Sequence, residues 1–292
     1  MWQVIVAGII AAVAFWWLMP SLGEAGRAHA LKAENHRGQT LPLVGGIAVG
    51  AAALLGLGFG TLLSAWSSGL AVLYSLAVLG FGWLGIVDDA LGDGGARGLK
   101  GHVAELARGR VTTGLLKALL GLVLGFLVSQ AIAWPGAGWP ARTAWLIVYA
   151  GVIALGANLF NLLDLRPGRA LKLYFAVVFA LLAATLVWRT RAVELGPLVV
   201  ISAAAAAYLP VDLRAEAMLG DAGANMLGGV LGLALVLVLP AWGALVAFAI
   251  LAALTLLSER FSFGRLIEGT PLLARFDAWG RSVDGGDEPG QR

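Results

Sequence analysis

The chain lacks cysteine altogether and has only three histidines among its 292 residues. The absence of cysteine excludes disulfide bonds, thiolate nucleophiles and cysteine-bound zinc. Charged residues are also scarce, at 13% of the chain against about 25% in soluble globular proteins. The net charge of +3 is too small to indicate a protein that binds nucleic acid. These absences exclude an ordinary soluble enzyme.

Apolar sequence fills most of the chain instead. Hydrophobic residues make up 60% of it, and the mean hydropathy is +0.87. About 20 apolar residues suffice to cross a hydrocarbon core of roughly 30 Å. Nine stretches approach this length: 2–19, 43–63, 68–87, 111–129, 142–157, 171–188, 195–211, 222–239 and 241–257. The sequence therefore predicts an all-α, polytopic transmembrane helix bundle of about nine spans over residues 1–257, followed by a tail at 258–292.

The charges collect on one side of this predicted bundle. When the connections are assigned alternately to two sides, one side holds 17 of the 20 Lys and Arg residues. The positive-inside rule makes that side cytoplasmic, with the N-terminus outside and the tail inside. The same side holds 16 of the 17 acids, all except Glu194. We therefore expect the chemistry at the cytoplasmic face, although outer connections too short to hold charges are an alternative explanation.

An acid pair ends the third predicted span. In "GFGWLGIVDDALGD", Asp88 and Asp89 lie at the negative end of the helix dipole, which disfavours each by a few tenths to about 1 kcal/mol. A compensating cation is expected, and Mg²⁺ suits one or two carboxylates that share it with phosphates. The next connection supplies Lys100 and Lys117, either for phosphate oxygens or as part of an ordinary positive-inside loop with a short amphipathic helix. The alternative to a bound cation is a hydrated helix end, at which water surrounds both carboxylates of the acid pair.

Small residues surround one acid at the start of the eighth span, "MLGDAGANMLGGVLG". Asp221 is placed to cap this helix. Gly223 and its alanine neighbours favour a helix start whose N–H groups are open to an anion. Gly228, Gly229 and Gly232 favour close helix packing.

The stretch "GANLFNLLDLRPGR", residues 156–169, is the most polar of the predicted helix ends. Asn161 and Asp164 share one helical face. An amide oxygen with carboxylates is an oxygen-only ligand set, suited to Mg²⁺ or Mn²⁺ rather than zinc. Capping of helix ends by these side chains is the alternative. The histidines, His29, His36 and His102, show no metal-ligand spacing, and we interpret them as ordinary loop residues.

Four stretches in this order resemble the polyprenyl-phosphate N-acetylhexosamine-1-phosphate transferase superfamily. They are "LPLVGG" at 41–46, the acid pair at 88–89, "NLFNLLD" at 158–164 and "GDAGANMLG" at 220–228. The resemblance covers roughly residues 20–257. It implies an enzyme of the bacterial inner membrane that transfers a phospho-sugar from a UDP-sugar donor to polyprenyl phosphate at the cytoplasmic face, releases UMP and requires Mg²⁺. It also suggests a homodimer.

The resemblance implies a role for each polar residue. Asp221 and Asn161 would hold the metal, and Asp88 and Asp89 would orient or deprotonate the lipid phosphate. Asp164 would support the nucleotide end, and either Lys100 or Lys117 would be the family's lysine. Asn158 and Gly223 would bind substrate. The stretch "DLRPGR" departs from the family's Asp-Gly-Leu-Asp-Gly pattern and adds Arg166 and Arg169 near the nucleotide end, where we expect them to bind substrate as well.

The tail contains a short predicted helix, "TPLLARFDAWGR". Thr270 is its expected N-cap, Pro271 its first residue and Gly280 its stop. Its apolar face consists of Leu272, Leu273, Phe276 and Trp279, which suit a membrane surface. We expect this helix to hold Arg260 and Arg265 near the donor, or else to be a plain anchor. A secondary transporter of anions, whose charges would lie near the bilayer midplane, and a non-catalytic scaffold are the alternative functions.

Overall fold

The computed structural model describes residues 1–29, 31–91, 98–130, 138–188 and 192–281, and it is almost entirely helical. In chain order its elements are α1 (Trp2–Ala28), β1 (Lys32–Glu34), β2 (Thr40–Pro42), α2 (Gly45–Leu62), α3 (Ser68–Leu91), α4 (Gly98–Ala107), α5 (Thr113–Gln130), α6 (Trp139–Leu163), α7 (Arg169–Trp188), a 3₁₀ turn (Ala192–Leu195), α8 (Gly196–Leu213), α9 (Gly220–Val238), α10 (Ala241–Ser258), α11 (Phe263–Gly269) and α12 (Pro271–Ala278).

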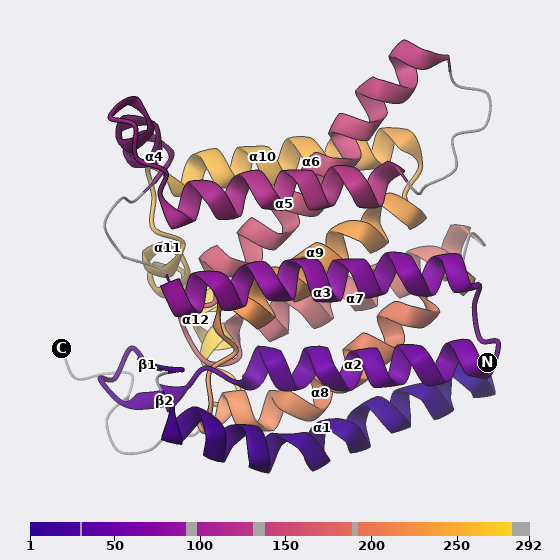
Figure 1. The fold of residues 1–292 in the computed structure, drawn as a ribbon, viewed down its shortest axis with the longest axis horizontal. Coiled ribbons are helices and arrows are strands. Elements are labelled where there is room, and N and C mark those ends of the chain that lie inside the picture. Colours follow the sequence, from indigo (N-terminus) through magenta and orange to yellow (C-terminus); the bar gives the residue numbers. More distant parts are fainter. Residues whose placement is uncertain (30, 92–97, 131–137, 189–191, 282–292) are drawn as a thin grey trace.

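Each of the nine predicted spans coincides with one long helix. These helices run roughly along one axis and alternate in direction, with α6 tilted from the others (Figure 1). Within the described part of the chain, seven helices are long and apolar enough to cross a membrane, and α5 contributes a shorter apolar stretch. The protein is therefore an all-α, multi-pass bundle of the membrane type, while the count of nine spans stays a prediction.

The most buried long helix is α9, which lies between α2, α3 and α6. A Cβ atom on Gly46 would lie 2.1 Å from the backbone N of Gly223, and one on Gly85 would lie 2.2 Å from the carbonyl O of Asp221. Glycine is therefore needed where α2 and α3 meet the first turn of α9. The predicted close packing of the 228–232 glycines is confirmed, since a Cβ on Gly228 would lie 2.4 Å from a backbone O of α6.

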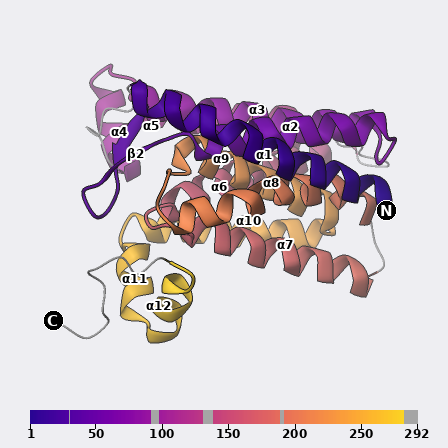
Figure 2. The same ribbon diagram turned by 90° about the horizontal axis from the view of Figure 1, so that it is seen from below.

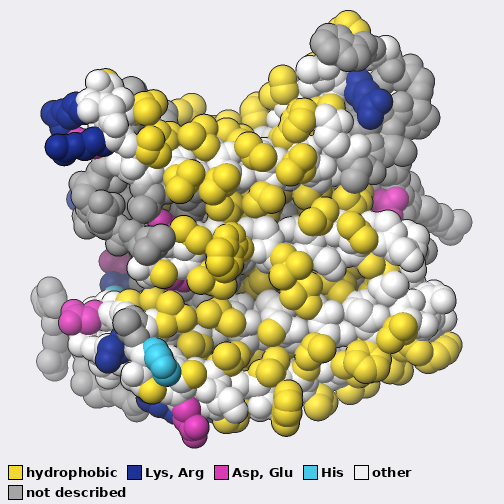
Figure 3. Space-filling view, in the orientation of Figure 1, with side chains coloured by type: hydrophobic (Ala, Val, Ile, Leu, Met, Phe, Trp, Pro, Cys, Tyr) yellow, Lys and Arg dark blue, Asp and Glu magenta, His cyan; other side chains and the backbone are white. Residues whose placement is uncertain are grey.

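Side chains at the surface divide by type along the bundle. Hydrophobic residues cover the middle, and most charged residues lie at one end (Figure 3). At the other end, the described residues include only two charged side chains: Arg142 near the start of α6 and Glu194 in the 3₁₀ turn. An apolar belt with polar ends is the expected surface of a bundle in a bilayer. The charged end is the one predicted to be cytoplasmic.

The short elements other than the 3₁₀ turn, namely β1, β2, α4, α11 and α12, lie at the charged end (Figures 1 and 2). Helix α11 and the two strands were not predicted, and β1 and β2 form an antiparallel hairpin with Ala33 opposite Leu41. The hairpin is tied to the start of α9, because the N–H of Met218 donates to the carbonyl of Pro42 at 2.9 Å. The first helix also continues nine residues past the predicted limit, to Ala28. The predicted tail helix is confirmed as α12, with Thr270 before it and Gly280 at a φ of +77°.

Candidate active site at the charged end

Asp89 joins two helices at the charged end. It lies in the last turn of α3, and its carboxylate accepts the backbone N–H groups of Asp221 at 3.0 Å and Ala222 at 3.1 Å. Asp89 therefore caps α9 from a neighbouring helix, and the positive end of that helix dipole offsets its charge. The expected N-cap role of Asp221 is wrong, because Asp221 lies inside the first turn, after Leu219.

Gly223 also differs from its predicted role. A Cβ atom there would lie 2.3 Å from the Leu219 side chain and 2.7 Å from the Cα of Gly46. Its neighbours Asp221 and Ala222 donate their N–H groups to Asp89. The start of α9 is therefore a packed helix junction rather than an open anion site, because a carboxylate of the chain already occupies it.

Four carboxylates gather around this junction. Asp164 follows the last residue of α6, and its N–H donates to the carbonyl of Phe160 at 3.0 Å. Burial first, and then the nearby carboxylates of Asp212, Asp221 and Asp89, raise the pKa of Asp164 well above its ordinary value. The ends of α3, α6, α8 and α9 thus bring these acids together. Asp88, half-buried, precedes Asp89 on α3.

Sequence reasoning missed Asp212, which it assigned to a loop. The side chain is 6% exposed and lies in the last turn of α8. Its Oδ2 accepts the N–H of Gly168 at 2.7 Å, and its Oδ1 lies 3.2 Å from the hydroxyl of Tyr208. The spacing of Tyr208 and Asp212, four residues apart at the end of an apolar run, was the available signal.

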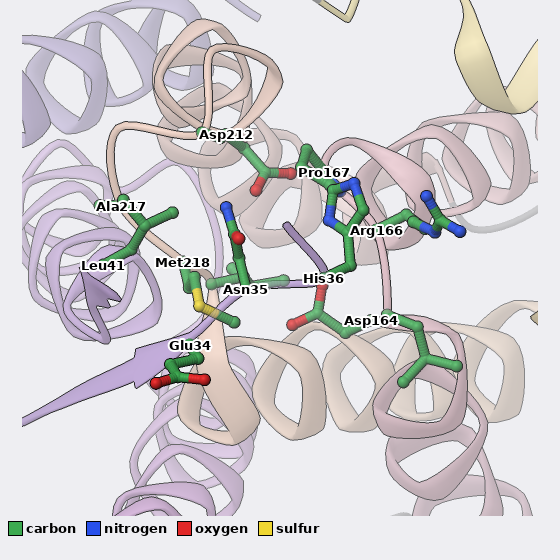
Figure 4. A pocket seen from close by; sticks show the side chains of 13 residues that line it. Glu34, Asn35, His36, Leu41, Asp164, Arg166, Pro167, Asp212, Ala217 and Met218 are labelled. Carbon is green, nitrogen blue, oxygen red and sulfur yellow. The ribbon is translucent and has the colours of Figure 1, made fainter. Parts of the chain in front are cut away.

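A cavity of about 340 Å³ opens beside these acids. Asp164 and Asp212 direct their carboxylates into it, and His36 reaches it from the hairpin (Figure 4). The prediction that His36 is a loop residue is confirmed, since it lies exposed in the turn between β1 and β2; the sequence did not show that this turn borders the cavity. The remaining lining residues are Glu34, Asn35, Leu41, Leu165, Arg166, Pro167, Ala215, Ala217, Met218 and Leu219.

The amides of α6 have different surroundings. Asn158 donates to the hydroxyl of Thr255 on α10 at 3.4 Å, which ties two helices together rather than facing a substrate. Asn161, one turn before Asp164, has a buried Nδ2 with no hydrogen-bond partner among the described residues. Asn225 on α9 is 3% exposed, and its Nδ2 likewise has no hydrogen-bond partner among the described residues. Buried amides without partners are costly, so they mark a region that a polar ligand would stabilise.

The described residues contain no group of three acidic or imidazole side chains that could hold a metal ion by themselves. Mg²⁺ is commonly bound by one or two carboxylates, with water and substrate phosphate completing the shell. Asp164 and Asp221 supply carboxylates, and Asn161 supplies an amide. This oxygen-only set fits Mg²⁺ or Mn²⁺ shared with a substrate, and does not fit a cage built by the protein alone.

The two arginines expected at the nucleotide are used inside the protein. Arg169 is 6% exposed and donates from Nε and Nη2 to the two carboxylate oxygens of Asp277, at 2.9 Å each. Arg166 donates to Glu268 at 2.8 Å, and its guanidinium points away from the cavity (Figure 4). Both side chains therefore contact the tail, and since Arg166 also lines the cavity, the expected substrate contacts stay predictions.

The other predicted cations lie farther out. Arg260 follows α10 and Arg265 belongs to α11; both side chains are exposed, and neither lines the cavity. Lys100 is on α4 and Lys117 on α5, and both of these side chains lie outside the described part of the structure. The choice between the two lysines stays open.

Comparison with known protein families and with curated protein sequences finds no match. The function is therefore argued from the site alone.

Proposed function

We propose that this protein transfers a phospho-sugar from a nucleotide sugar, expected to be UDP-linked, to polyprenyl phosphate at the cytoplasmic face of the bacterial inner membrane. The products would be a lipid-diphosphate-sugar and UMP. The observation that carries the proposal is the meeting of Asp89, Asp164, Asp212 and Asp221 at the charged end of an apolar bundle. Acids in such a place suit a reaction between a membrane lipid and a charged soluble donor.

The electrostatics of the acids support a divalent cation as cofactor. Carboxylates crowded in a partly buried site repel one another, and a bound cation reverses the sign of that interaction. Asp164, Asp221 and Asn161 would hold Mg²⁺, with Mn²⁺ as a substitute. When bound, the metal neutralises charge that develops on the transferred phosphoryl group.

The acid pair divides into two roles under this proposal. Both carboxylate oxygens of Asp89 accept backbone hydrogen bonds from α9, so Asp89 positions Asp221 rather than taking a proton. Asp88 lies on the last turn of α3, at the level where a lipid phosphate would arrive. We therefore assign the orientation or deprotonation of the lipid phosphate to Asp88.

The donor would enter through the cavity. Its volume of about 340 Å³ falls in the usual range of small-molecule sites. Asp164 and Asp212 form one wall, and His36 approaches from the hairpin. Since Arg166 and Arg169 are held by the tail, we assign contacts with the nucleotide to the hairpin and to the loop after α6.

Release of UMP tests the proposal. Purified protein in vesicles is supplied with polyprenyl phosphate and a UDP-N-acetylhexosamine, and UMP is measured with and without Mg²⁺. UMP that requires both lipid and metal supports the transferase. Uptake of an anionic solute into the vesicles without UMP would favour the transporter, and the absence of both would favour the scaffold.

A further inference from the structure

The loop that carries Asp164 lies between the cavity and the tail. Residues 164–167 line the cavity. On the other side, Asp277 of α12 receives both hydrogen bonds from Arg169 and lies 2.7 Å from the guanidinium of Arg281. Arg281 also donates from Nε to the carbonyl of Pro167 at 2.8 Å. The tail therefore contacts the same short segment that forms the cavity wall.

The outer contacts extend this attachment. Glu268 of α11 pairs with Arg166 at 2.8 Å, and Lys172 of α7 donates to the carbonyl of Phe276 at 3.2 Å. From the bundle side, Asp212 accepts the N–H of Gly168. The loop is thus held between α8 and the tail. Both restraints act within four residues of Asp164.

One face of α12 is exposed although it is apolar. Its members are Leu272, Leu273, Phe276 and Trp279, which are 78%, 43%, 50% and 72% exposed. Asp277 lies at one edge of this face and is buried against the bundle, while Arg275 lies at the other edge and is exposed. A helix with a strong apolar face edged by a cation is typical of the lipid headgroup boundary.

The position of the tail indicates what covers this face. Figure 2 shows α11 and α12 outside the outline of the long helices, level with their charged ends. Immediately before the tail, Leu256 and Leu257 in the last turn of α10 are exposed on the apolar belt. A helix beside a membrane bundle at this level meets the surface of the surrounding leaflet.

We infer that α11 and α12 form a clamp that is seated in the headgroup boundary of the cytoplasmic leaflet and holds the loop of residues 164–168 in place. Asp277 and Arg169 are positioning residues, which act on Asp164 through this loop. The effect on activity rests on the proposed transferase function. The contact with lipid does not.

Single cysteines test the contact with lipid cleanly, because the chain has no native cysteine. A nitroxide is attached to Leu272→Cys on the apolar face or to Ala278→Cys on the opposite face, in vesicles of phosphatidylethanolamine and phosphatidylglycerol. We expect the label at 272 to collide mainly with oxygen and the label at 278 mainly with a water-soluble nickel complex. Equal accessibility at both positions would overturn the inference, as would shielding of position 272 from both reagents, which would indicate a protein partner.

The Asp277→Asn variant tests the positioning role. We expect kcat to fall roughly 10- to 100-fold with little change in the KM for lipid, because small displacements of reacting groups are costly. Asp277→Glu should recover part of the rate, and Arg275→Gln on the same helix is the control. A wild-type kcat in Asp277→Asn would overturn the role. Absence of UMP release from the wild-type protein would instead count against the transferase proposal and leave the lipid measurement standing.

Discussion

At the residue scale, Asp89 links the two helix ends that meet in the site. The C-terminal end of α3 carries partial negative charge and the N-terminal end of α9 carries partial positive charge. The carboxylate lies between them and accepts two N–H groups of α9. The Asp89 carboxylate thus satisfies two backbone donors and fixes the position of the Asp221 backbone.

Replacement of Asp89 by alanine removes both acceptors. We expect Asp89→Ala to lower the free energy of unfolding by about 0.5–2 kcal/mol, the usual cost of a lost N-cap. Thermal unfolding in detergent measures this loss. Asp89→Asn keeps one acceptor oxygen and should lose less. Equal unfolding temperatures for the alanine variant and the wild type would show that the cap contributes nothing.

Asp221 should behave in the opposite way, with a large effect on activity and a small one on stability. In Asp221→Asn the charge that is proposed to hold Mg²⁺ is lost, while the helix start stays capped by Asp89. We expect UMP release to fall at least about 100-fold. Glu216→Gln, an exposed carboxylate in the preceding connection, is the matched control. Near-normal activity of the Asp221 variant would contradict the metal assignment.

The pKa of Asp277 predicts how the tail responds to acid. Burial alone would raise this pKa, but hydrogen bonds and charges from Arg169 and Arg281 outweigh burial and lower it. A lowered pKa in the folded protein means that the ionised form stabilises docking above the ordinary carboxyl pKa of about 3.9, and that this stabilisation is lost as the pH falls through the lowered value. The mobility of a nitroxide at position 272 should therefore stay low at neutral pH and increase only in strong acid. High mobility of that label in Asp277→Asn at all pH values is the expected control.

At the element scale, the long helices follow from the sequence because a bilayer admits only structures that satisfy their own backbone groups. The tail helix follows from local signals at Thr270, Pro271 and Gly280. The hairpin does not, since three-residue strands leave almost no pattern. The partner of Arg169 could not be predicted either. Asp277 lies 108 residues away, and because most cations and acids share one face, the sequence offers many alternative pairs. Sequence reasoning found the acids of the site but missed Asp212 and His36, which belong to it only through packing.

Two helix contacts of α9 depend on the absence of side chains. A Cβ atom at Gly46 or Gly85 would overlap the backbone of α9 at 2.1 or 2.2 Å, and backbone cannot move aside cheaply. We expect Gly46→Ala and Gly85→Ala each to destabilise the protein by about 1–3 kcal/mol through overpacking and to lower activity by moving Asp221. Gly58→Ala on α2 and Gly82→Ala on α3 are matched controls, since nothing lies within 4 Å of a Cβ atom there. Equal thermal stability of all four variants would contradict this account.

At the scale of the whole molecule, the arrangement separates two tasks. Along the apolar middle of the bundle, α9 is buried by its neighbours, and the outer helices expose leucine, valine and phenylalanine on the surface expected to meet lipid. At the charged end, the hairpin and the loop after α6 line the cavity beside the acids, and the tail packs against the other side of that loop. A rigid apolar scaffold thus fixes the helix ends, and short segments complete the site.

The orientation of the bundle decides whether this site can meet a cytoplasmic donor. Since 17 of the 20 Lys and Arg residues belong to one side, the positive-inside rule puts the charged end in the cytoplasm. We expect a reporter fused after Arg292 to be active only inside the cell and one inserted at residues 131–141 to be active only outside. Each fusion must retain UMP release, so that the topology measured is that of folded protein. A tail that a membrane-impermeant reagent reaches in intact cells would contradict the orientation. The carboxylates of Asp164 and Asp221 would then lie on the opposite side of the membrane from a cytoplasmic nucleotide-sugar donor.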